Sequence, residues 1–165
     1  MRAALLPAVL LFSACGGGGG GGTSVAAPVR LSVPDLDLGP ATTSAELLVQ
    51  FAQPPATGTA LLQVAIELPP ALTIAPGAPL QPGQPLATLK GEMVSGRYLV
   101  VCGDDRNREA LPLRTGLLFS LRLATTTPRQ VGTFQITLRD LLAARSDSSN
   151  ADGDVNPVVA TVIVR

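Results

Sequence analysis

Charge and composition narrow the classes of function open to this chain. It has 165 residues, and its twelve basic and twelve acidic side chains give a formal net charge of zero. Balanced charge produces no general field that attracts nucleic acid or an anionic membrane, so we expect no nucleic-acid partner. Histidine is absent, which excludes histidine-based nucleophilic triads and imidazole metal ligands. With no paired-acid motif in the sequence either, we do not expect an enzyme.

The N-terminal residues have the three parts of a secretory signal. Arg2 is the charged start, residues 3–12 are an apolar run, and Ser13 and Ala14 form a small-residue exit before Cys15. Such a segment is removed from the mature protein. This one is too short for a transmembrane helix, which needs roughly 20 apolar residues. We expect residues 1–14 to be cleaved off.

Residues 11–15 resemble the lipobox of bacterial lipoproteins, with Phe12 where that family usually has leucine. The resemblance implies that Cys15 receives a diacylglycerol thioether, becomes the acylated N-terminus and anchors the protein in a lipid bilayer of the cell envelope. Gly16, which is not aspartate, implies transport to the outer membrane of a Gram-negative cell. The alternative is an ordinary secreted protein with a cysteine near its cleavage site.

An unbroken run of glycines, Gly16–Gly22, follows Cys15. Glycine loses more backbone entropy on ordering than any other residue, so this run forms neither a core nor a helix. We expect a flexible tether with a reach of roughly 15 Å. The chain thus divides into a signal peptide at 1–14, a lipidated cysteine with its tether at 15–27, and one domain at 28–165.

Apolar and polar residues alternate along most of that domain, which is typical of half-buried strands. The alternation or a strand-like composition covers residues 29–33, 45–51, 62–68, 86–93, 96–102, 117–123, 134–138 and 158–164. Turn-forming residues separate these runs, for example Ser95-Gly96. The only helix candidate, residues 141–145, is too short to organise a fold. Eight or nine short strands at this spacing indicate an all-β sandwich.

Two local features are interpreted as structural. Proline recurs every third residue from Pro76 to Pro85, a period that matches polyproline II, and we interpret the segment as a stiff connection between strands rather than as a ligand for adaptor domains. Cys102 ends the strand-like run 98–102, so we expect a small buried hydrophobic side chain rather than a reactive thiol.

The order of segments resembles the cohesin domain. The alternating run 62–68 leads into Pro69-Pro70-Ala71-Leu72, similar to a Pro-x-x-Leu step of that family. A Pro/Gly-rich crossing follows, and residues 96–101, 116–123 and 132–138 match later family strands in type and spacing. The resemblance implies a nine-stranded jelly-roll (immunoglobulin-like) β-sandwich of the cohesin and carbohydrate-binding-module group, with its N- and C-terminal strands near each other.

Residues 146–156 hold the densest set of oxygen ligands in the sequence. Asn150, Asp152 and Asp154 are candidate Ca²⁺ ligands, although the EF-hand pattern fails because Ser148 and Val159 occupy its first and last ligand positions. The alternative is a solvated turn that uses Asp, Asn and Gly for their backbone tolerance.

The sequence therefore predicts a non-catalytic, lipid-anchored binding or scaffolding protein of the cell envelope. The cohesin resemblance implies a protein partner that carries a dockerin-like module. The alternative is a carbohydrate-binding module for a surface polysaccharide, which needs exposed aromatic rings. Tyr98 is the only tyrosine or tryptophan in the sequence.

Overall fold

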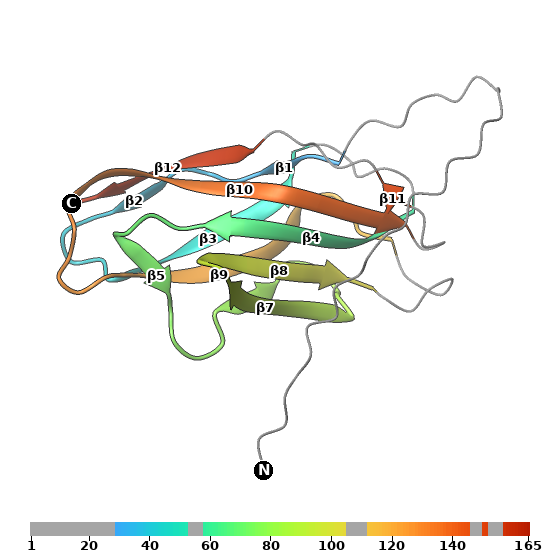
Figure 1. Cartoon of the computed structure of the whole chain (residues 1–165), viewed down its shortest axis with the longest axis horizontal. Coiled ribbons are helices and arrows are strands. Elements are labelled where there is room, and N and C mark those ends of the chain that lie inside the picture. Colours follow the sequence, from blue (N-terminus) through green and yellow to red (C-terminus); the bar gives the residue numbers. More distant parts are fainter. Residues whose placement is uncertain (1–28, 53–57, 105–111, 146–149, 152–156) are drawn as a thin grey trace, which may run out of the picture.

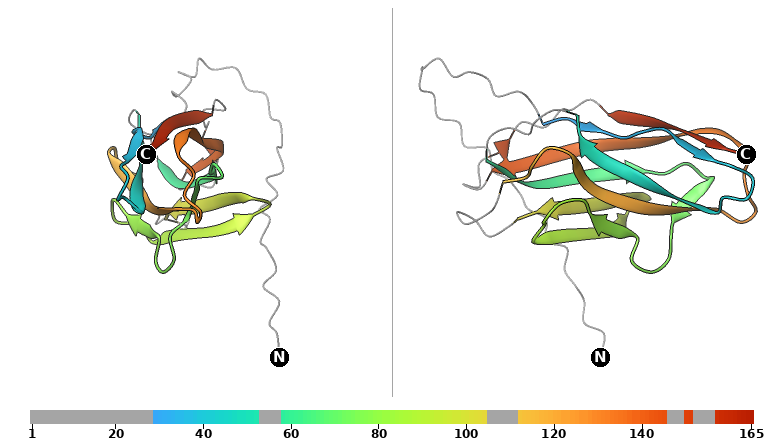
Figure 2. Two further views of the ribbon diagram at one scale, coloured as in Figure 1. Left: turned by 90° about the vertical axis from the view of Figure 1, so that its left-hand side faces the viewer. Right: turned by 180° about the vertical axis from the view of Figure 1, so that it is seen from behind.

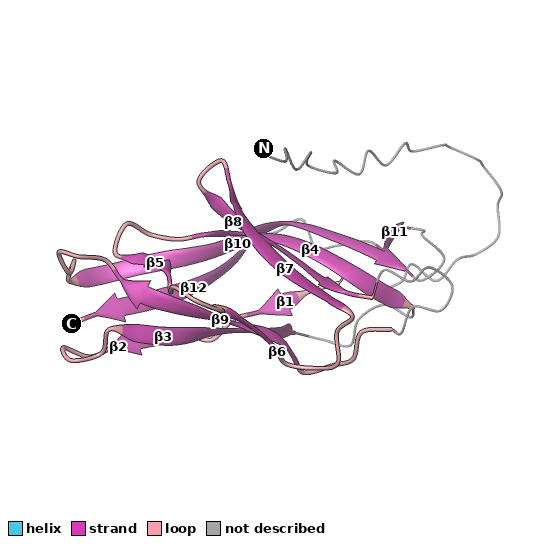
Figure 3. Ribbon diagram, turned by 90° about the horizontal axis from the view of Figure 1, so that it is seen from below, coloured by secondary structure: helices cyan, strands magenta, loops and turns pink. Residues whose placement is uncertain are grey.

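The structure, a computed structural model, describes residues 29–52, 58–104, 112–145, 150–151 and 157–165. This part of the chain contains strands and no helix (Figure 3). The strands form two sheets that pack face to face, so the expected all-β sandwich is confirmed (Figures 1 and 2). None of the described residues forms a helix long and apolar enough to span a membrane.

The first sheet has five strands. Their order is β1 (Leu31–Ser32), β3 (Ser44–Phe51), β9 (Leu117–Thr125) and β5 (Leu72–Ile74), and β6 (Leu80–Pro82) also pairs with β9. All of these pairs are antiparallel. Figure 2 shows β3 and β9 on the near side when the molecule is seen from behind.

The second sheet has seven strands and forms the opposite layer. Their order is β2 (Leu36–Leu38), β12 (Val158–Val164), β10 (Gly132–Arg145), β4 (Thr59–Glu67), β8 (Arg97–Gly103) and β7 (Thr88–Val94), and β11 (Asn150–Ala151) also pairs with β10. β2 runs parallel to β12, so strands from the two ends of the domain lie side by side, as the resemblance implies.

Alternation of side chains explains why these segments form strands around one core. In β4, Leu62, Val64 and Ile66 point inward and are at most 1% exposed. From the other sheet, Leu121 and Phe119 of β9 meet them in the same cluster and are fully buried. Burying such side chains stabilises the fold by about 1.5–3 kcal/mol each.

The structure corrects the expectation of a helix at residues 141–145. These residues continue strand β10, and Leu142, Ala143 and Ala144 pair with β4. Leu and Ala favour helix locally, but the long neighbouring strand offers hydrogen-bond partners that a one-turn helix lacks. Leu141 packs against the core, whereas Leu142 points outward and is 52% exposed. Tertiary pairing therefore overrides local propensity here.

The proline-rich connection is held along the edge of β9. Ala75 N–H donates to Arg122 O, and Arg122 N–H donates to Pro79 O, at 3.0 and 2.8 Å. Residues 80–82 then pair with β9 as strand β6. Pro82 fits because proline is tolerated on an edge strand. The segment does connect strands, but part of it is a strand rather than free polyproline II.

Candidate functional site: the outer face of the seven-stranded sheet

We use "the outer face" for the side chains of β7, β8, β4 and β10 that point away from the core. The strand registers align them in rows, because residues paired across antiparallel strands lie on the same side of a sheet. Leu99, Ala65 and Arg139 form one row, since Ala65 pairs with both of the others. This face includes Gln63, Ala65, Glu67, Lys90, Glu92, Val94, Arg97, Leu99, Val101, Thr137, Arg139, Asp140 and Leu142.

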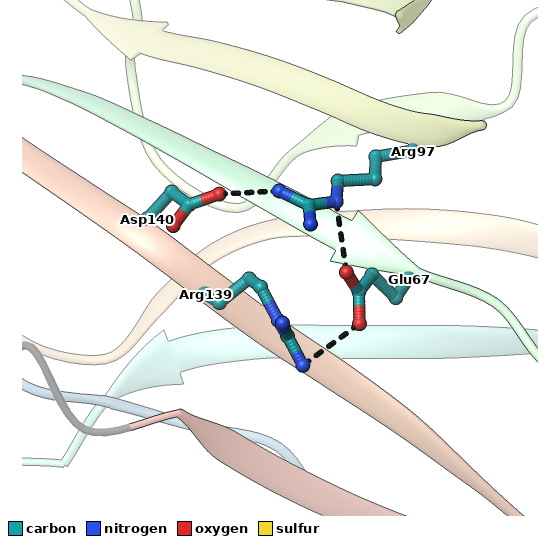
Figure 4. Close-up of polar contacts among 4 residues, drawn as sticks. All are labelled: Glu67, Arg97, Arg139 and Asp140. Atoms are coloured by element: carbon teal, nitrogen blue, oxygen red, sulfur yellow. Dashed lines mark hydrogen bonds and ion pairs between the residues drawn. The ribbon is translucent and has the colours of Figure 1, made fainter. Parts of the chain in front are cut away.

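Four charged side chains form a continuous network on the outer face (Figure 4). Arg97 Nε lies 2.8 Å from Glu67 Oε1, and Arg97 Nη1 lies 2.8 Å from Asp140 Oδ2. Arg139 Nη2 lies 2.9 Å from the other oxygen of Glu67. These side chains are between 30% and 58% exposed, so each pair contributes at most about 1 kcal/mol to stability. The network therefore adds little to the stability of the fold.

A β-bulge places Asp140 in this network. The register between β10 and β4 shifts between Arg139 and Leu142, and Asp140 has φ of 54°. Ser95, in the turn between β7 and β8, has φ of 50°. Within the described residues these are the only non-glycine residues with positive φ. The two-residue hairpin turn Ser95-Gly96 requires positive φ at Ser95, whereas the positive φ of Asp140 comes from the bulge.

Both residues border one shallow, open hollow on the outer face. Its volume is about 420 Å³, and it is lined by Gln63, Ala65, Val94, Ser95, Arg97, Leu99 and Asp140. Its lining thus combines apolar side chains, such as Ala65 and Leu99, with the charged Arg97 and Asp140. A contact from another molecule would meet both kinds of surface there.

Exposed apolar side chains lie on the same side of this sheet, and one of them, Val94, lines the hollow. Leu142 is 52% exposed and Val94 43%, and Val159 on neighbouring β12 is 48% exposed. On the outer side of the opposite sheet, Leu48 of β3 is the only large apolar side chain among the described residues that is similarly exposed. Clustered exposed apolar side chains mark interaction surfaces, whereas isolated ones are ordinary.

The aromatic side chains of the described residues face the interior. Phe51, Tyr98 and Phe119 are buried, and Phe134 packs against the core. Burial also raises the pKa of the Tyr98 hydroxyl by desolvation. These rings therefore do not form a platform on which a sugar ring stacks.

Cys102 lies where the sequence predicts. Its side chain is fully buried on the inner side of β8. Desolvation raises the pKa of its thiol to about 12, so the thiol is protonated and inert at neutral pH.

The other site residues expected from the sequence lie largely outside the described part. Cys15, Asp152 and Asp154 fall in undescribed segments, and Asn150 is described only as the first residue of β11. The candidate calcium site therefore stays a prediction. Among the described residues, no group of three or more Cys, Asp or Glu side chains is arranged to hold a metal ion.

Sequence reasoning missed the charged network. Glu67, Arg97 and Arg139 come from three strands that are far apart in the chain. The only local signal is that each occupies an outward position of an alternating run. Which strands become neighbours is a tertiary property that periodicity does not carry.

No family model matches the chain, and no curated protein matches it significantly. Solved structures with a similar fold are cohesin modules. CaCohA2 from Clostridium acetobutylicum has a TM-score of 0.67 at 16% identity, over 84% of this chain and 92% of that chain. The OlpA cohesin from Clostridium thermocellum, solved in a cohesin–dockerin complex, has a TM-score of 0.66 at 14% identity, over 84% and 99%. A non-cellulosomal cohesin from the archaeon Archaeoglobus fulgidus has a TM-score of 0.57 at 11% identity, over 81% and 91%. The chain thus has the jelly-roll β-sandwich fold of cohesin modules.

Proposed function

We propose that this protein is a non-catalytic, lipid-anchored binding module of the bacterial cell envelope. Its outer face docks a partner protein that carries a dockerin-like module. The observation that carries the proposal is the outer face, where ion-paired charges border exposed apolar side chains. The fold adds support, because similar cohesins have been solved in complex with dockerins. Fold alone does not assign function, so the proposal rests mainly on the side chains of the outer face.

The outer face offers both kinds of contact that a protein interface uses. Leu142 and Val94 provide apolar area that a partner covers. Asp140 uses Oδ2 for Arg97, which leaves Oδ1 as an acceptor for a donor on the partner. Arg97 is already held between two carboxylates, so binding costs little side-chain ordering.

Polysaccharide binding is the rival function. It needs exposed aromatic rings, and the described rings of Phe51, Tyr98, Phe119 and Phe134 lie in or against the core. That placement favours a protein partner over a glycan.

The anchoring half of the proposal is supported by the sequence. Cys15 provides the acylation site, and Gly16–Gly22 provide slack between the bilayer and the domain. In this arrangement the domain reorients freely at the surface of the outer membrane, and its outer face meets partners without a fixed approach direction.

The test compares matched charge insertions on the two sheets. Full-length protein in detergent is used to capture proteins from an envelope and secreted extract of the source organism. Three forms are compared: the natural chain, Leu142→Asp on the outer face, and Leu48→Asp on the opposite sheet. Both leucines are exposed, so neither change is expected to unfold the domain.

We expect a partner whose recovery falls at least tenfold with Leu142→Asp and is unchanged with Leu48→Asp. A buried, unpaired charge at an interface costs about 2 kcal/mol or more, which corresponds to such a loss. Purified partner is then titrated against the same three proteins. Equal binding by all three forms would contradict docking through the outer face, and binding only to purified polysaccharide would favour the rival.

A further inference from the structure

Strand β7 is an open edge of the seven-stranded sheet. It pairs with β8 on one side only and lies at the margin of the sheet in Figure 1. Residues 90–94 are all exposed, including Met93 at 60%. Within the described residues no backbone hydrogen bond reaches its far side. Such an edge is a template for another strand unless its sequence prevents pairing.

The hairpin geometry determines which backbone groups of β7 face outward. Val94 and Arg97 flank the two-residue turn Ser95-Gly96, and a pair in that position exchanges both hydrogen bonds. On the other side of β8, Asp104 N–H donates to Ala60 O of β4 at 2.8 Å. This bond agrees with the same alternation of residues bonded to β7 and residues bonded to β4. It follows that Leu89, Gly91 and Met93 direct their N–H and C=O groups away from the sheet.

Three residues in the middle of β7 make this edge complementary to itself. In an antiparallel pair of two β7 strands centred on Gly91, Lys90 of each copy lies opposite Glu92 of the other. Leu89 then lies opposite Met93, and both direct their backbone N–H and C=O groups toward the other copy. Shifting the centre by one residue places Lys90 opposite Lys90, or Glu92 opposite Glu92. Like charges directly opposite each other are destabilising, so the charges select one register.

We propose that β7 is a homodimerisation edge, at which two copies of the chain join through an antiparallel β7–β7 pair centred on Gly91. The two-fold axis of this pair is perpendicular to the sheet. Both outer faces therefore lie on the same side and form one continuous surface. This inference does not depend on the proposed partner, although a dimer would present two docking faces together.

The seam is short, so the association is expected to be weak. A single strand pair buries less than the roughly 1,200 Å² of a stable interface. For copies tethered to one membrane, confinement raises the effective concentration and favours pairing. In solution we expect dimer to be measurable at about 100 µM protein.

Reversing the charges of Lys90 and Glu92, singly and together, tests the proposed register of the β7–β7 pair. Sedimentation equilibrium of full-length protein in density-matched detergent is measured for the natural chain, Lys90→Glu, Glu92→Lys and the double exchange. Each single variant places like charges opposite each other and is expected to weaken dimerisation at least tenfold. The double exchange recreates both pairs and is expected to restore it. An equimolar mixture of the two single variants is expected to associate more strongly than either alone. Circular dichroism checks that all forms are folded.

A zero-length carbodiimide cross-link provides an independent readout, because Lys90 is the only lysine in the chain. Mixed unlabelled and ¹⁵N-labelled natural protein is expected to give a Lys90–Glu92 product between labelled and unlabelled peptides. Natural protein that stays monomeric up to about 1 mM would overturn the proposal. So would a Lys90→Glu variant that dimerises as well as the natural chain, or a double exchange that fails to restore dimerisation.

Discussion

Burial controls the chemistry of Cys102. Its thiol has a pKa raised from 9.0 to about 12 in the folded protein, because desolvation disfavours the thiolate. A raised pKa gives stability that is fully present below the unfolded pKa and is lost as the pH rises toward the folded value. Stability therefore falls between pH 9 and pH 12 through this group.

The expected loss is about 1.4 kcal/mol at pH 10 relative to pH 8, and Cys102→Ala is expected to remove it. Denaturant unfolding of both proteins at the two pH values measures the difference. Identical pH dependence in the natural chain and Cys102→Ala would show that the thiol titrates normally. Ellman's reagent is expected to react with Cys102 only after unfolding.

Other residues have roles that no local pattern predicts. Arg129 donates hydrogen bonds to the carbonyl oxygens of Leu38, Gly39, Thr42 and Arg165, at 2.7 to 3.0 Å. Its guanidinium thereby joins the loop before β10 to the segments beside β2 and to the end of β12. In the sequence Arg129 is one arginine in a polar loop, and only the fold gives it these partners.

At the scale of strands, the alternating sequence pattern predicts where strands form, but it does not predict which strands pair with each other. The alternating runs around Ile66 and Phe119 are strands with the expected inward faces. Residues 141–145 are a helix candidate in the sequence because their local composition of Leu and Ala does not reveal the adjacent β4. For the same reason the outer-face network is invisible in the sequence, since it depends on β8, β4 and β10 being neighbours.

Gly103, at the end of β8, lies very close to the backbone of β4. Gly103 has φ of 134°, and a Cβ there would collide with the backbone oxygen of Ala60. That carbonyl accepts the Asp104 N–H, so it cannot move without breaking the β4–β8 pairing. We expect Gly103→Ala to lower the free energy of unfolding by about 3 kcal/mol.

Gly96→Ala is the matched control. Gly96 also has positive φ, 82°, but no atom lies within 4 Å of the position a Cβ would occupy. Its cost is limited to the left-handed backbone, about 1 kcal/mol. Thermal or denaturant unfolding of both variants separates the two effects, and equal losses would mean that the close approach at Gly103 is absent.

At the scale of the whole molecule, the domain is expected to be attached to the membrane at one end. Cys15→Ser is expected to abolish lipidation, so that the protein leaves the membrane fraction and accumulates in uncleaved or soluble form. Fractionation and intact-mass measurement check this. A mature natural protein that begins at another residue, without a lipid, would contradict the anchor.

Docking of a protein partner on the outer face of the seven-stranded sheet can be tested at the level of individual side chains. Hydroxyl-radical footprinting of the free protein and of its complex with the captured partner tests this most directly, because it reports the exposure of individual side chains. We expect oxidation of Leu142, Val94 and Leu99 to fall in the complex, while Leu48 on the opposite sheet is unaffected. Protection of Leu48 with unchanged oxidation of Leu142 would place the partner on the other sheet and would contradict docking through the outer face.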